Sequence, residues 1–147
     1  MFVKTACNST TYPDKCYKSL STYSTAIKSD PIKLCTTALK LNVKSAKEAT
    51  SVVAKLLKKS QKSAAGRKSK MVPITEMKTL RAGDSIAEHI TNVRTWVSSA
   101  LTDEGTCTDG FEEVKVNKET KKTVTKVVQE LATTTSNTLA LITNLSY

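Results

Sequence analysis

Apolar residues recur every three or four positions over three long segments of the chain, which is the spacing of one face of an α-helix. The first segment opens at Asp30-Pro31, where a helix-capping side chain precedes a proline suited to the first turn, and it extends over 30–59. The other two cover 84–102 and 117–143. The pattern predicts three long helices, whose inward positions are Ile32, Cys35, Leu39, Val43, Ala46, Ala49, Val53 and Leu56, then Ile86, Ile90, Val93, Val97, Ala100 and Leu101, then Val124, Val127, Val128, Leu131, Leu139 and Ile142.

The remaining N-terminal residues, 1–29, divide into short helical stretches that form an arm ahead of the long helices. The 147 residues include 39% hydrophobic side chains, enough for one modest core, and few glycines, prolines and phenylalanines for a β-sandwich. We therefore expect a single all-α domain over 1–147, made of the arm at 1–29 and a helix bundle at 30–147.

The chain is strongly basic, with a formal net charge of +10, so polyanions are among its expected partners. Seven basic residues and no acidic one lie within 55–70, and a basic, flexible connection is expected at 60–72. A solvated helix end is the alternative interpretation. No aromatic residue is interleaved there for base stacking, so nucleic acid is not expected. No apolar run approaches the roughly 20 residues of a membrane helix, so no membrane partner is expected either.

Catalytic and metal-binding signatures are missing from the sequence. The single histidine stands in no H-E-x-x-H pattern, and neither a G-x-S-x-G motif nor a phosphate-binding loop occurs. No two cysteines have the close spacing of a zinc site. We therefore predict a protein that is not an enzyme and that has no catalytic residue, metal or cofactor.

Cys7 and Cys16 flank a short segment around Pro13, which a disulfide could close in a secreted protein, the alternative being two reduced thiols. Asn8 and Asn144 each begin an N-glycosylation sequon, relevant only after export. The residues from Met1 to Val3 are too short for the core of a signal peptide, so this sequence as written is expected to lack an export signal.

Three segments of the chain resemble one known family. They read FVKTACNSTTYPDKCY at 2–17, TWVSSALTDEGTCTDGF at 95–111 and TSNTLALI at 135–142. In this order they resemble the plant invertase and pectin methylesterase inhibitor family, and the resemblance covers most of the chain. It implies an N-terminal helical hairpin followed by an up-and-down four-helix bundle, and an extracellular protein of the cell wall or apoplast.

The chain departs from the family pattern between the first and third bundle helices. The family carries a long second helix there, with a cysteine that bonds the one corresponding to Cys107, whereas 60–83 contains no cysteine. Most of that helix is therefore expected to be missing, with only a stub at 73–81. Cys35 is then the remaining candidate partner of Cys107, a buried free thiol being the alternative for Cys35. The segment 95–111 is interpreted as a helix end, a cysteine-stapled turn and the start of another helix.

Loss of a bundle helix predicts an uncovered apolar groove. Three outcomes are open: rearrangement to a three-helix bundle, self-association through the groove, or a poorly folded product of an altered transcript. The stripe expected to be exposed consists of Ile32, Leu39, Val53, Ile90, Val97, Val128 and Leu139.

By resemblance, the expected function is inhibition of an enzyme by covering its substrate cleft. Pectin methylesterase is the favoured target because the Pro-Lys-Phe tripeptide of invertase-directed members is absent. The expected contact surface is the polar face of the third bundle helix, and an ordinary solvated face is the alternative. Two other functions stay open: the pro-region of a larger pectin methylesterase, and a basic binder of acidic pectin without inhibitory activity. The contact residues are Thr91, Arg94, Thr95, Ser98 and Thr102.

Overall fold

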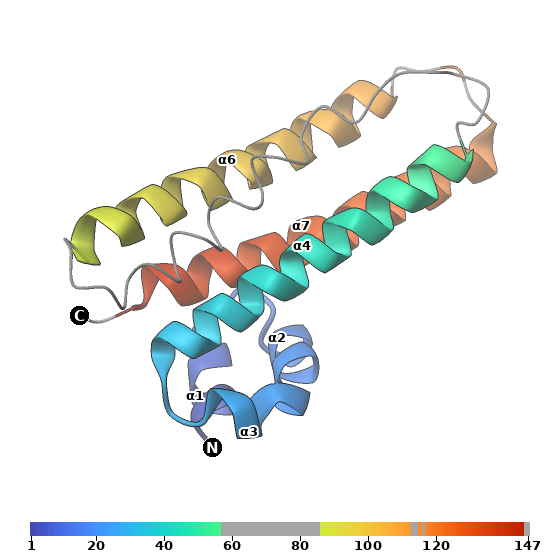
Figure 1. Ribbon diagram of the computed structural model, residues 1–147. Coiled ribbons are helices and arrows are strands. Elements are labelled where there is room, and N and C mark those ends of the chain that lie inside the picture. Colours follow the sequence, from blue (N-terminus) through green and yellow to red (C-terminus); the bar gives the residue numbers. More distant parts are fainter. Residues whose placement is uncertain (57–85, 113–114, 116, 146–147) are drawn as a thin grey trace.

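The computed structural model describes residues 1–56, 86–112, 115 and 117–145 (Figure 1). Every regular element in these ranges is helical, which confirms the predicted all-α class. The arm contains α1 (Phe2–Cys7), α2 (Pro13–Leu20), the short 3₁₀ turn η1 (Ser21–Tyr23) and α3 (Ser24–Ile27). The long helices are α4 (Pro31–Leu56), α6 (Ile86–Glu112) and α7 (Lys118–Thr143).

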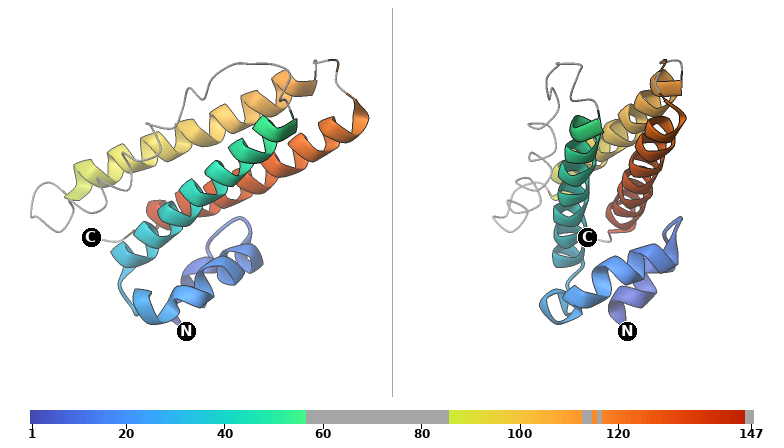
Figure 2. Two further views of the ribbon diagram at one scale, coloured as in Figure 1. Left: turned by 45° about the vertical axis from the view of Figure 1, so that its right-hand side comes forward. Right: turned by 90° about the vertical axis from the view of Figure 1, so that its right-hand side faces the viewer.

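The three long helices lie side by side, and α7 packs against both α4 and α6 (Figures 1 and 2). Helices α4 and α6 run in the same direction, and α7 runs opposite to both. These are the directions of the first, third and fourth helices of an up-and-down four-helix bundle. The basic connection at 60–72, the stub at 73–81 and the missing second helix all fall within 57–85, outside the described residues.

The start of α4 follows the capping chemistry that the sequence predicts, and the start of α7 is capped in the same way. The Asp30 side chain accepts hydrogen bonds from the backbone N–H groups of Ile32, at 2.9 Å, and Lys33, at 3.0 Å. The Asn117 side chain accepts one from the N–H of Thr120 at 2.8 Å. Each cap satisfies N–H groups that have no partner within the first helical turn.

Helix α6 ends at Glu112, ten residues beyond the end at 102 that the sequence pattern predicts, and the expected turn within 95–111 was wrong. The helix continues through Gly105 and Gly110, and a Cβ at either position would have no atom within 4 Å apart from those of the adjoining residues and the helix's own backbone. The inward stripe also continues beyond Val97, but with the carboxylate of Glu104 in place of an apolar side chain. The apolar pattern therefore ends before the helix does.

The main core lies between the arm and the long helices. It joins Val3, Cys7 and Leu20 of the arm to a larger set of buried residues on the bundle, Leu34, Cys35, Leu39, Val43, Ile90, Val93, Val97, Leu141 and Ile142. The expected exposed apolar stripe was therefore wrong: Leu39, Ile90, Val97 and Val128 are buried, and Ile32, Val53 and Leu139 are half-buried. Five of the seven residues belong to the main core or pack against it, so the stripe gives no support to self-association.

Candidate functional site

The predicted contact residues lie together on the outer face of α6. Thr91, Arg94, Thr95, Ser98 and Thr102 are all exposed, on the side away from the buried Ile90, Val93 and Val97. Three threonine hydroxyls on this face donate to carbonyl oxygens of their own helix, from Thr91 to Ala87 at 2.8 Å, Thr95 to Thr91 at 2.9 Å and Thr102 to Ser98 at 3.2 Å. Their side chains are thereby fixed on the helix, while oxygen lone pairs remain on the surface.

Four of the five residues on this face carry hydroxyl groups. Arg94 is the one charged member of the five residues. Within the described ranges, no three His, Cys, Asp or Glu side chains are placed to hold a metal ion. No helix of the described chain combines the length and apolar character needed to cross a membrane. The face is thus a row of exposed hydroxyl groups and one guanidinium group on a regular helix.

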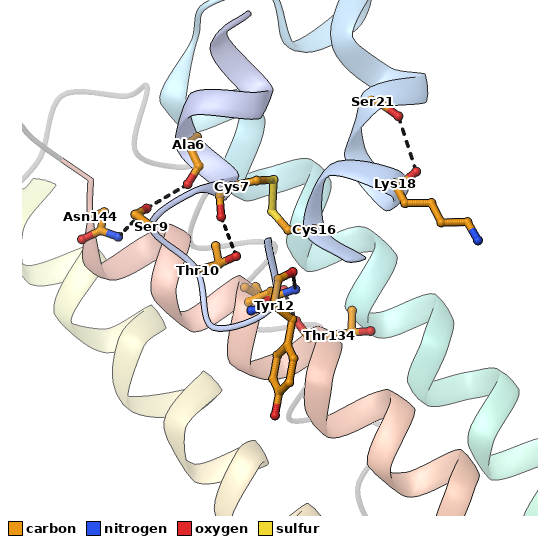
Figure 3. The surroundings of a disulfide bond; sticks show 12 residues. Ala6, Cys7, Ser9, Thr10, Tyr12, Cys16, Lys18, Ser21, Thr134 and Asn144 are labelled. Atoms are coloured by element: carbon orange, nitrogen blue, oxygen red, sulfur yellow. Dashed lines mark hydrogen bonds between the residues drawn. A yellow bond between two sulfur atoms is a disulfide. The ribbon is translucent and has the colours of Figure 1, made fainter. Parts of the chain in front are cut away.

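The arm is closed by a disulfide between Cys7 and Cys16, as the sequence predicted (Figure 3). The Cα atoms of the two cysteines are 5.5 Å apart. Inside the loop, the buried Thr10 hydroxyl donates to the carbonyl oxygen of Cys7 at 2.7 Å, and the Ser9 hydroxyl donates to that of Ala6 at 2.8 Å. The covalent bond and these hydrogen bonds give the loop a defined shape.

Asn137 fastens this loop to α7. Its side-chain oxygen accepts a hydrogen bond from the N–H of Tyr12 and its amide nitrogen donates to the carbonyl oxygen of Tyr12, both at 3.0 Å. The Asn144 amide donates to the Ser9 hydroxyl at 3.0 Å, and the Ser136 hydroxyl donates to that of Thr11 at 3.3 Å. The sequence analysis singled out 135–142 only as a resemblance. These contacts show that the segment positions the arm.

Both predicted glycosylation residues, Asn8 and Asn144, are exposed at this joint. The second sequon ends at Ser146, which lies outside the described residues. Because the amide nitrogen that would carry a glycan on Asn144 is hydrogen-bonded to Ser9, a glycan there would adjoin the loop. Glycosylation of either residue stays a prediction.

A buried polar network joins the three long helices. The Thr135 side chain of α7 is fully buried, and its hydroxyl accepts from the Asn42 amide of α4 at 2.8 Å. The same hydroxyl can donate its one proton either to a carboxylate oxygen of Glu104 on α6, at 2.9 Å, or to the Leu131 carbonyl oxygen, at 3.0 Å. The sequence analysis missed this network. The feature of the sequence that indicates this network is a set of polar residues that interrupt the apolar stripes of all three helices.

The expected bridge between Cys35 and Cys107 was wrong, because both are free thiols. Cys35 faces the core from α4, whereas Cys107 is exposed on α6. Burial raises the pKa of the Cys35 thiol from 9.0 to about 12, since the core disfavours the charged thiolate. The alternative interpretation of Cys35, a buried free thiol, is confirmed.

We expect the two free thiols to differ sharply in reactivity, because alkylation requires an accessible thiolate. In native protein at pH 8, iodoacetamide should modify Cys107 at least 100-fold faster than Cys35, and in urea both should react at similar rates. Peptide mapping by mass spectrometry measures the modification. A Cys107→Ser variant, which should take up no label in the native state, is the control. Rapid labelling of native Cys35 would contradict its buried position.

Comparison with known proteins identifies the family. The family described as "Plant invertase/pectin methylesterase inhibitor" matches residues 1–141. The chain belongs to this inhibitor family. A protein of Arabidopsis thaliana, "Pectinesterase inhibitor 4", is 58% identical, with 99% of this chain and 82% of the relative covered. A "21 kDa protein" of Daucus carota is 37% identical over 97% of this chain and 82% of its own length. No solved structure matches the chain.

The alignments also bear on the shortened second helix expected in this inhibitor-family chain. Alignment with Pectinesterase inhibitor 4 extends over 163 positions, whereas the chain has 147 residues. At least 16 aligned positions are therefore empty in this chain. That length corresponds to about four turns of helix.

Proposed function

We propose that this protein inhibits a plant pectin methylesterase outside the cell, in the apoplast or cell wall, by placing the outer face of α6 across the substrate cleft of the enzyme. Membership of the inhibitor family supports the type of function, and the relative named Pectinesterase inhibitor 4 supports the target. The protein itself has no catalytic role in this proposal.

The observation that carries the proposal is the exposed, ordered row of side chains on α6. Binding costs less entropy when the contacting groups are already held in place, and here the helix and its threonine hydrogen bonds hold them. Ser98 is central on this face, with Arg94 and Thr95 before it and Thr102 one turn after it. A small side chain at the centre allows the close approach of a second protein surface.

Substitution at the centre of the face tests the proposal. We expect Ser98→Trp to weaken inhibition of pectin methylesterase at least tenfold, because a bulky side chain would hold the two surfaces apart. The matched control is Ser99→Trp, also exposed but about 100° further around the helix, and it should change inhibition less than twofold. Inhibition constants from residual esterase activity are the measurement, with circular dichroism to check that both variants fold.

Equal losses in both variants, or no loss in either, would contradict α6 as the contact surface. Failure of the unmodified protein to inhibit any plant pectin methylesterase would contradict the proposed function itself and favour the polyanion-binding alternative. The pro-region alternative stays a prediction that the described helices do not address.

A further inference from the structure

An open groove lies where the arm meets α7, with Leu101 of α6 at its border. Its polar lining consists of Tyr12 and Lys15 from the arm and of Lys126, Gln129, Glu130, Thr133 and Ser136 from α7. The proposed enzyme-contact surface, by contrast, consists of residues of α6. The groove is therefore a second surface feature, to which the sequence analysis assigned no role.

The groove places a cation beside an aromatic ring on a rigid support. The Lys15 ammonium lies 5.9 Å from the centre of the Tyr12 ring, and the tyrosine is 43% exposed. The N–H and carbonyl groups of Tyr12 are both hydrogen-bonded to Asn137 of α7, so the tyrosine of the arm is held in a fixed position against that helix. An exposed ring held in this way offers a flat apolar surface next to a positive charge.

A row of lysines extends the groove along α7. Lys118, Lys122 and Lys126 are all exposed and follow one another at four-residue intervals, which places them on one face about 6 Å apart along the axis. Within the described part of the chain, none of the three forms an ion pair. Like charges at this spacing repel each other, so a bound polyanion would relieve the repulsion.

We propose that the groove and the lysine row bind a linear polysaccharide of carboxylated sugars, such as the de-esterified pectin that a pectin methylesterase produces. The lysines match a series of carboxylates, the Tyr12 ring can stack on a sugar ring, and Gln129 and Thr133 can hydrogen-bond sugar hydroxyls. A single aromatic residue offers little for successive nucleic-acid bases. This inference goes beyond the proposed inhibition and does not depend on it.

Glu130 provides an internal check, because its carboxylate lines the groove and would repel an acidic sugar. Replacing this glutamate with the isosteric neutral amide should tighten binding. If binding came only from general attraction to a protein of charge +10, removing a negative charge at any exposed site would tighten binding to the same extent. A change in affinity that depends on where the charge is removed therefore distinguishes a defined site from diffuse attraction.

The experiment measures binding of the full chain to polygalacturonate oligomers by calorimetry at 0.1 M salt. We expect Lys15→Gln/Lys126→Gln to weaken binding at least tenfold, Tyr12→Ala about fivefold, and Glu130→Gln to tighten it two- to threefold. The matched control, Lys40→Gln/Lys44→Gln on α4, removes the same charge from exposed positions and should change binding less than twofold. Fully methyl-esterified oligomers should bind at least tenfold more weakly.

Equal effects of the two double variants would overturn the site and leave only diffuse charge attraction. Equal affinity for single-stranded DNA of matched charge, or no binding of polygalacturonate by the unmodified protein, would also overturn it. Inhibition of the esterase on a short, fully methyl-esterified substrate should be unchanged in Lys15→Gln/Lys126→Gln. Loss of carbohydrate binding with inhibition retained would show that the two surfaces act separately.

Discussion

Thr135→Val should lower the free energy of unfolding by about 3 kcal/mol, although valine has nearly the shape of threonine. The substitution takes a hydrogen-bond acceptor from the Asn42 amide and a donor from the Glu104 carboxylate, and all three side chains are buried. A buried polar group that loses its partner costs about 1–3 kcal/mol, and more when it is charged. Urea denaturation at pH 7 measures the change.

Thr134→Val is the matched control for this effect. The Thr134 hydroxyl donates only to the Glu130 carbonyl of its own helix, at 3.1 Å, in a more exposed position. We expect its loss to change stability by less than about 0.5 kcal/mol, as is usual for surface substitutions. A Thr135→Val protein as stable as the control would show that the network contributes little.

Reduction of the bond between Cys7 and Cys16 should lower stability by about 3 kcal/mol and loosen the arm. Most of this loss is the entropy that the unfolded chain regains when a loop of this length is opened. The Tyr12 N–H, bonded to Asn137, should exchange with solvent faster after reduction. Thermal unfolding with and without dithiothreitol, combined with amide exchange, measures both effects.

The double variant Cys7→Ala/Cys16→Ala separates the disulfide from other actions of the reductant. It should be destabilised to a similar extent and should not respond further to dithiothreitol. The free thiols of Cys35 and Cys107 form no bridge that the reagent could break. A further loss of stability in the double variant would point to a second reducible bond.

Burial of the expected apolar stripe bears on the expectation that most of the second bundle helix is missing. Alignment with Pectinesterase inhibitor 4 leaves at least 16 positions empty in this chain, so the chain is shorter than that relative within the aligned region. Even so, Leu39, Ile90 and Val97 lie in one core with residues of the arm and α7. The three described bundle helices keep the four-helix directions and retain a shared core.

Local patterns in the sequence determined the arm, its disulfide, the cap at Asp30, and the courses of α4 and α7. Each depends on residues close in the chain, such as a capping side chain and the N–H groups two or three positions later. The exposure of the α6 face also followed from helical spacing, because Ile90, Val93 and Val97 define the opposite, buried side. The family resemblance was likewise readable from three short segments.

The tertiary structure alone decided which distant residues meet. Asn137 contacts Tyr12 across 125 positions of sequence, and Thr135 meets Asn42 across 93, so no local period could predict either pair. The structure also decided the length of α6, because Glu104 is buried through its contact with Thr135 and not through apolar character. A polar residue can occupy a core position when a partner from another helix satisfies it, and that partner is chosen by packing.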